Sequence, residues 1–298
     1  MRFFHETNFD FVGWRRKAFL ISGVLILVSV ISLVVKGGPA LSVDFRGGVV
    51  IELKFRDPIS TEAIRSALDR AGYGKSEILN LGTPTEFLIN AEAAVDKDVT
   101  SIIKSSISQA VPDNPYEILR EEMVGPKVGK ELARKAIWAT LFSLGAMLVY
   151  IAWRFEFRFG VGAIASLVHD AVTVIGLFSI LNKEISMAVI AAILTLIGYS
   201  VNDTIVVFDR IREDLKKYHR DPLEIVINRA INETLSRTVI TALTVFIVVV
   251  FLYIMGGEVL RDFSFAMLYG VVTGCYSSVF VAAPILVEWN LRSPMRRR

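Results

Sequence analysis

Residues 186–208 read SMAVIAAILTLIGYSVNDTIVVF, and this stretch decides how the chain folds. A helix of about 20 such residues crosses the ~30 Å hydrocarbon core of a membrane. Asp203 is the only acidic or basic residue in the stretch, and a carboxylate at that depth costs about 2.5–3.5 kcal/mol. Charged residues inside membrane spans usually face a bundle interior or a wet cavity and mark an ion pathway. The stretch therefore predicts ion or proton handling rather than soluble enzyme chemistry.

The whole chain is apolar enough to contain several spans. Of its 298 residues 53% are hydrophobic, and the mean hydropathy is +0.51. Both values exceed those of ordinary soluble domains and favour a membrane protein. Six segments are predicted to cross the membrane as helices: Ala18–Val35, Ala136–Trp153, Phe159–Leu181, Ile185–Phe208, Thr238–Met255 and Phe263–Trp289.

Basic residues orient these spans, because Lys and Arg concentrate in cytoplasmic loops. Clusters occur before span one, between spans two and three, after span four and at the chain end. We therefore expect residues 1–17, the loop 209–233 and the basic tail 292–298 to be cytoplasmic, and residues 36–130 to lie outside. Span one also has the basic start and apolar core of a signal peptide, but it lacks an A-x-A cleavage site.

Residues 36–130 are far more polar than the rest and predict a small α+β domain. Strands are expected within Leu41–Phe55 and at Ile78–Leu81, Phe87–Ala91 and Tyr116–Met123, with helices at Ser60–Ala71 and Asp96–Val111. This β-α-β-β-α-β order is that of a ferredoxin-like fold. A domain of this length can hold a hydrophobic core of its own. The predicted architecture is a polytopic α-helical membrane protein of six spans, with this domain between spans one and two.

Polar residues form stripes along three of the spans at helical spacing. The stripes are Ser166, His169, Asp170 and Thr173 on span three, Thr195, Gly198, Tyr199, Asn202 and Asp203 on span four, and Thr234, Arg237, Thr238, Thr241 and Thr244 on span five. Together they suggest one polar seam inside the bundle. The threonines alone are also explained by hydrogen bonds that help helices pack, whereas packing does not need the carboxylate of Asp203.

Arg237 is the expected counter-charge of Asp203, because antiparallel spans four and five place the two residues at similar depth. An arginine keeps its proton, so Asp203 could alternate between a paired carboxylate and a neutral acid; alternatively, Arg237 reaches the lipid headgroups. His169 and Asp170 could join a proton relay or form a static contact that braces span four. Gly270 and Gly274 belong to a ridge of small residues on span six that permits close helix packing, within this chain or against another.

Other site classes find little support. The single cysteine excludes a disulfide framework. Three histidines far apart in sequence suggest no metal site. No nucleotide-binding G-x-x-x-x-G-K-[ST] loop is present. We expect neither a cofactor nor a nucleic-acid partner.

Four blocks of sequence resemble the SecF family of bacterial protein-export membrane subunits. The most specific is GYSVNDTIVVFDRIRE, residues 198–213, which is similar to the span-four signature of that family. DFRGG, residues 44–48, looks like its motif after span one and contains Asp44, Arg46, Gly47 and Gly48. NETLSRT, residues 232–238, and LRDFS, residues 260–264, resemble the starts of spans five and six.

This resemblance implies a half-transporter of the RND superfamily that pairs with SecD. It further implies help to the SecYEG channel and the SecA motor, with the proton-motive force used to move unfolded polypeptide across the bacterial inner membrane. In the family, the residues that match Asp203 and Arg237 are implicated in proton transport. The chain is then a transport subunit and not an enzyme.

Two other functions share the same membrane core. Half of a small-molecule efflux pump is one, although such pumps use much larger outer regions than residues 36–130. A membrane scaffold without ion coupling is the other, and an Asp203→Asn exchange would separate it from a proton-coupled subunit.

Overall fold

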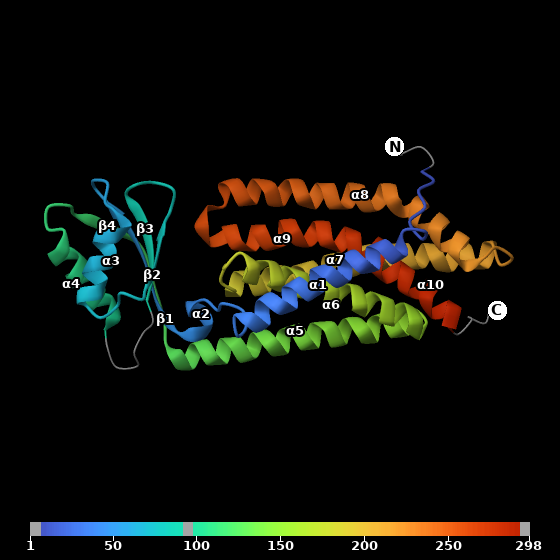
Figure 1. Ribbon diagram of the computed structural model, residues 1–298, viewed down its shortest axis with the longest axis horizontal. Helices are drawn as coiled ribbons and strands as arrows, with labels where there is room; N and C mark the ends of the chain where they lie inside the picture. Colours follow the sequence, from blue (N-terminus) through green and yellow to red (C-terminus); the bar gives the residue numbers. More distant parts are fainter. Residues whose placement is uncertain (1–6, 92–97, 293–298) are drawn as a thin grey trace. The chain divides into compact units, whose positions relative to one another are not determined.

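The computed structural model describes residues 7–91 and 98–292, and the chain divides into two compact units (Figure 1). The smaller unit comprises Leu41–Trp138, and the larger unit comprises the chain up to Ala40 and from Ala139 onward. The predicted helix Asp96–Val111 has its first two residues outside the described part. The same holds for the chain's first six residues and for residues 293–298 of the basic tail.

The smaller unit has the predicted ferredoxin-like fold. Its elements follow in the order α2 (Val43–Arg46), β1 (Gly48–Phe55), α3 (Thr61–Arg70), β2 (Glu77–Asn80), β3 (Glu86–Ala91), α4 (Val99–Ala110) and β4 (Tyr116–Val124). The strands pair antiparallel in the order β2-β3-β1-β4. This arrangement is the split β-α-β topology that the sequence order predicts.

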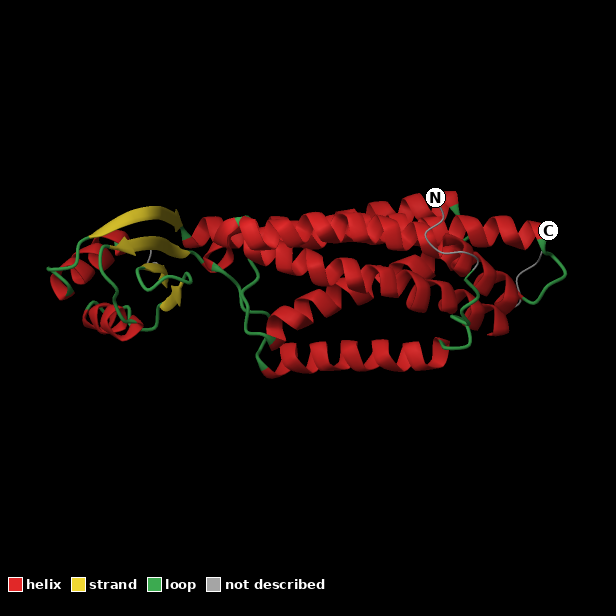
Figure 2. Cartoon of the chain, turned by 90° about the horizontal axis from the view of Figure 1, so that it is seen from above, coloured by secondary structure: helices red, strands yellow, loops and turns green. Residues whose placement is uncertain are grey.

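One face of this sheet carries the core. Val49, Ile51 and Leu53 of β1 alternate with outward-facing neighbours, as the twofold period of a strand requires, and they are at most 1% exposed. Both long helices of the unit pack on this face through apolar residues spaced at helical intervals, such as Ile64 and Ile103. Figure 2 shows these helices in red beside the yellow strands.

Six helices of the described chain are long and apolar enough to cross a membrane, which confirms the six-span prediction. They are α1 (Arg15–Val35), α5 (Pro126–Arg154), α6 (Phe157–Ile180), α7 (Met187–Lys217), α8 (Leu223–Met255) and a last span made of α9 (Gly257–Ser277), the π-helical turn η1 (Ser278–Ala282) and α10 (Ala283–Arg292). Helices α7 and α8 extend well beyond the apolar stretches, so only residues 218–222 of the segment 209–233 are non-helical.

The small-residue ridge of the last span packs within this chain, against α7. A Cβ atom at Gly270 would lie 2.5 Å from Leu196 Cδ2, and one at Gly274 would lie 3.4 Å from Ser200 Cβ. Because glycine has no side chain at these points, the two helices approach closely. This close approach lets Ser200 of α7 and Ser277 of α9 reach the same carboxylate, Asp170.

Two asparagines of α8 hold the segment that precedes α1. Asn232 Oδ1 accepts a hydrogen bond from Phe9 N at 2.9 Å, and the side-chain amides of Asn228 and Asn232 donate to Phe9 O at 3.0 and 2.9 Å. Asn228 Oδ1 also accepts from Val12 N at 3.2 Å. We call these four bonds the asparagine clasp. It pairs main-chain groups of the segment with side chains one helical turn apart.

Candidate functional site

Asp203 lies on α7 with its carboxylate enclosed by hydroxyl groups from two other elements. Thr238 of α8 donates to Asp203 Oδ1 at 2.6 Å, and Ser278 of η1 donates to Oδ2 at 2.6 Å. The residue is 4% exposed. A buried carboxylate costs much free energy unless its oxygens are hydrogen-bonded, and here each oxygen has a hydroxyl donor.

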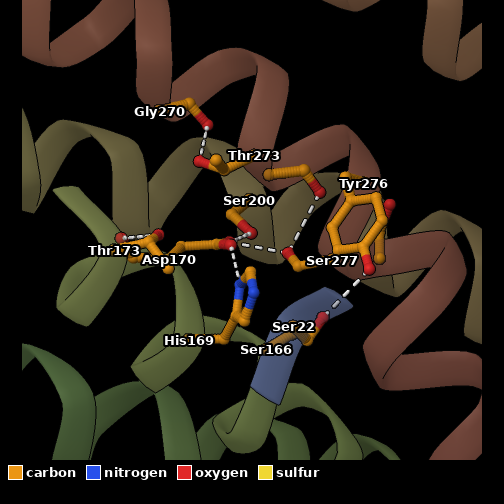
Figure 3. Close-up of polar contacts among 12 residues, drawn as sticks. Ser22, Ser166, His169, Asp170, Thr173, Ser200, Gly270, Thr273, Tyr276 and Ser277 are labelled. Atoms are coloured by element: carbon orange, nitrogen blue, oxygen red, sulfur yellow. Dashed lines mark hydrogen bonds and ion pairs between the residues drawn. The ribbon is translucent and has the colours of Figure 1, made fainter. Parts of the chain in front are cut away.

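A second buried carboxylate, Asp170 of α6, lies in a hydroxyl cluster of its own (Figure 3). Its Oδ2 accepts hydrogen bonds from Ser200 of α7 and Ser277 of α9, both at 2.7 Å. Its Oδ1 lies 3.1 Å from Nδ1 of the preceding residue, His169. Asp170 therefore joins three helices, and both residues are at most 2% exposed.

His169 has one ring nitrogen without a partner. Nδ1 is bonded to Asp170, whereas buried Nε2 has no hydrogen-bond partner among the described residues. The ring lies beside that of Tyr276, with centroids 6.0 Å apart, and the Tyr276 hydroxyl is 3.0 Å from Ser22 Oγ and donates to Ala18 O (Figure 3). A buried polar atom without a partner costs about 1–3 kcal/mol. Such a cost is tolerated most readily where a proton or a water molecule can arrive.

Consecutive residues serve the two carboxylates. Ser277 ends α9 and binds Asp170, and Ser278 begins η1 and binds Asp203. The π-helical turn changes the hydrogen-bond register of the backbone at this point, and π-turns inside helices occur frequently at functional sites. The two carboxylates are thus linked through a single peptide unit.

The structure places Arg237 away from direct contact with Asp203. Within the described part of the chain no ion pair joins the two side chains, and Arg237 is exposed. Together with Asn202, which is also exposed, it lines an open cavity of about 1370 Å³ among α7, α8 and the segment before α1. Thr238, the next residue after Arg237, contacts the carboxylate instead.

The residues of the DFRGG block form a tight turn in the smaller unit. Gly47 has φ +82°, a conformation that L side chains rarely adopt. A Cβ atom at Gly48 would lie 2.6 Å from Ala91 O. Asp44 and Arg46 belong to the short helix α2 that precedes the turn. The two glycines therefore have a structural reason: they let β1 begin directly beside β3.

No group of three or more His, Cys, Asp or Glu side chains within the described residues is arranged to hold a metal ion. The site consists of carboxylates, hydroxyls and one imidazole. Carboxylates and imidazoles are groups that can take up and release protons, and hydroxyl groups can donate to a carboxylate or accept from a carboxylic acid.

The sequence does not indicate the roles of three hydroxyls that the structure brings to these carboxylates: Ser200, Ser277 and Ser278. From the sequence alone, helix packing explains Thr238. Ser278 follows Gly270 and Gly274 at the same interval of four residues, and Ser200 lies in the span-four signature, but neither position indicates a carboxylate partner. The early start of α8 is visible in the sequence, because Leu223, Ile227 and Ile231 continue the helical period before the apolar stretch.

Comparison with known proteins identifies relatives for nearly the whole chain. Residues 100–292 match the family described as "Protein export membrane protein SecD/SecF, C-terminal", and residues 31–59 match the "SecD/SecF GG Motif". The chain is 45% identical to the protein translocase subunit SecF of Rhodothermus marinus, over 100% of this chain and 98% of that protein. It is 39% identical to that of Endomicrobium trichonymphae, over 99% and 96%.

Two solved structures share the fold. One is the crystal structure of SecDF, a translocon-associated membrane protein from Thermus thermophilus, with a TM-score of 0.87 and 37% identity. The other is SecDF in a super-membrane-facing form, with a TM-score of 0.71 and 36% identity. The matches cover 96% and 97% of this chain but only 39% and 40% of those chains. This chain thus spans about two fifths of the length of the SecDF chains it resembles.

Proposed function

Because the chain belongs to the SecF family of protein translocase subunits, we propose that it couples the proton-motive force to polypeptide export through the protonation of Asp203. The observation that carries this proposal is the burial of the Asp203 carboxylate between α7, α8 and η1, with one hydroxyl donor on each oxygen. A fixed structural contact at this depth does not need an ionisable group.

The proposed arrangement in the membrane follows from the basic clusters. Both ends of the chain and residues 209–233 face the cytoplasm, the smaller unit lies on the outer side, and the membrane is the bacterial inner membrane. The open cavity lined by Arg237 and by Asn202, the residue before Asp203, then faces the cytoplasm. Arg237 attracts the carboxylate at longer range, and both residues take part in proton transport, as do His169 and Asp170.

A SecD polypeptide completes the membrane body in this proposal. The name SecDF of the solved chains joins SecD and SecF, and the present chain matches only two fifths of the length of each of those chains. The SecYEG channel, the SecA motor and an unfolded polypeptide are the further partners. A proton that crosses 100 mV supplies about 2.3 kcal/mol. That amount can bias a two-state movement of the outer domain but cannot unfold a domain whose stability is about 5–15 kcal/mol.

The test is export of a secretory protein into inverted membrane vesicles that contain this chain and its SecD partner, with and without a proton gradient. We expect Asp203→Asn to abolish the gradient-dependent part of export. Asp209→Asn is the matched control, because Asp209 lies on the same helix but pairs with Arg154 at 3.0 Å, and its side chain is 44% exposed. Gradient-dependent export that survives in Asp203→Asn would refute the coupling and favour a scaffold.

A further inference from the structure

We propose that Ser277 and Ser278 form a paired hydroxyl switch that makes the protonation of Asp203 and the protonation of Asp170 depend on each other. The inference deepens the proposed function and rests on it, since it takes Asp203 to be a group that gains and loses a proton. Its first support is position: two adjacent residues donate to two different buried carboxylates at 2.6 and 2.7 Å.

The second support is that each serine has an alternative acceptor. Ser278 Oγ lies 3.0 Å from Cys275 O, and Ser277 Oγ lies 3.2 Å from Gly274 O. A hydroxyl carries one proton and cannot donate fully to two acceptors at once. Each serine can therefore give its proton to the carboxylate or turn it to the main chain three residues earlier.

The switch works through this choice. When Asp203 takes up a proton from water, the new O–H group donates to Ser278 Oγ, and Ser278 turns its own proton to Cys275 O. Ser278 begins the π-helical turn, so a change in its side-chain bonding also changes the bonding of the backbone that holds Ser277. Ser277 then binds Asp170 with a different geometry. No proton passes between the two aspartates.

Other ionisable groups around the carboxylates set the background for this coupling. Arg237 of α8 acts electrostatically on Asp203, and Asp203 in turn acts on Tyr199 of α7 and Cys275 of α9. Cys275 also lies within electrostatic range of Asp170.

On the Asp170 side, the neighbouring ionisable groups are His169 of α6 and Tyr269 of α9. A direct electrostatic effect of one carboxylate on the other is expected as well. The experiment must therefore distinguish coupling through the serines from coupling through the field.

Infrared titration of the full chain with its SecD partner in lipid vesicles makes this distinction, because the carboxyl C=O stretch reports protonation. The bands are assigned with Asp203→Asn and Asp170→Asn. We expect Asp170→Asn to move the titration midpoint of Asp203 by about one pH unit, a tenfold change in proton affinity. By linkage, Asp203→Asn moves the midpoint of Asp170 by the same amount.

The serine variants carry the decisive comparison. In a Ser277→Ala, Ser278→Ala background we expect the mutual shift to fall to less than a third. Ser166→Ala is the matched control, since Ser166 is also fully buried but donates only to the main-chain oxygen of Ala163, and it leaves the shift unchanged. If the double variant fails to fold, judged by size-exclusion chromatography, Ser277→Ala alone provides the same comparison.

Four results would overturn the inference. A mutual shift that persists without the serines shows that the field alone couples the carboxylates. An Asp170 band that does not titrate leaves nothing for Ser277 to respond to. An Asp203 midpoint that is unchanged in Asp170→Asn refutes the switch while the proposed function stands, whereas an Asp203 that never titrates refutes both.

Discussion

Replacing Thr238 by valine is expected to cost more free energy of unfolding at high pH than at low pH. Valine has nearly the shape of threonine but lacks the hydroxyl that donates to Asp203 Oδ1 at 2.6 Å. A hydrogen bond to a charged group contributes about 1.5–3 kcal/mol, whereas a neutral one between membrane helices averages about 0.6 kcal/mol. The cost of Thr238→Val should therefore rise by about 1–2 kcal/mol when Asp203 ionises.

Reversible unfolding of the detergent-solubilised chain by SDS, followed through its four tryptophans, measures this cost at the two ends of the pH range. Thr241→Val is the control, because the Thr241 hydroxyl donates to the main-chain oxygens of Arg237 and Thr238, each at 3.0 Å, and its side-chain partner is the Tyr199 hydroxyl and not a carboxylate. Its cost should be small and the same at both ends. An equal cost of Thr238→Val at both pH values would refute the view that Asp203 changes charge while it is bonded to the hydroxyls of Thr238 and Ser278.

Three further variants test close packing at two glycines and the cap at the start of α4. Gly176→Ala should lower the free energy of unfolding in the SDS assay by about 1–3 kcal/mol, because its Cβ would lie 2.8 Å from Ser29 Cα. Gly48→Ala should speed amide exchange at the end of β3, measured by mass spectrometry, because its Cβ would meet Ala91 O at 2.6 Å. Hydrogen bonds from Ser101 hold the pKa of Asp98 below its usual value, so Asp98 stabilises the start of α4 above its unfolded-state pKa, and this contribution is lost as pH falls through the folded-state pKa. Asp98→Ala should remove this pH dependence from amide exchange in α4, after correction for intrinsic rates.

Each of these variants has a control in the same chain. Gly145→Ala on α5 meets no atom within 4 Å and should be neutral or slightly stabilising, so an equal loss at Gly145 and Gly176 would contradict the packing argument. A Cβ atom at Gly82 would meet no atom within 4 Å, but Gly82 has φ +90°. Gly82→Ala therefore shows the effect of backbone strain without the collision expected at Gly48. Asp98→Asn keeps an oxygen that can accept from Ser101 but does not titrate; a pH dependence that persists in Asp98→Asn would contradict the assignment to Asp98.

The architecture could be predicted because its causes are local in the sequence. Alternating apolar residues such as Val49, Ile51 and Leu53 show a half-buried strand, and a run of about 20 apolar residues shows a span. The depth of Asp203 was equally predictable, since the residue stands alone in such a run. These features depend on the chemistry of neighbours along the chain and not on how helices dock.

The partners of Asp203 could not be predicted, because they depend on helix rotation and on a change of register. Charge alone favoured Arg237, yet the helix presents Thr238 to the carboxylate and leaves Arg237 at the cavity. Ser278 reaches Asp203 from a π-helical turn. No pattern in residues 278–282 predicts this turn.

The asparagine clasp determines which movement a spectroscopic label before α1 would report. A spectroscopic label at Asn8 precedes α1 in the chain, but the bonds from Asn228 and Asn232 to Phe9 attach that stretch to α8. The label would therefore report displacements of α8 relative to the rest of the bundle. A bulky fusion partner placed there would slow the movement of α8, the helix that carries Thr238 and Arg237.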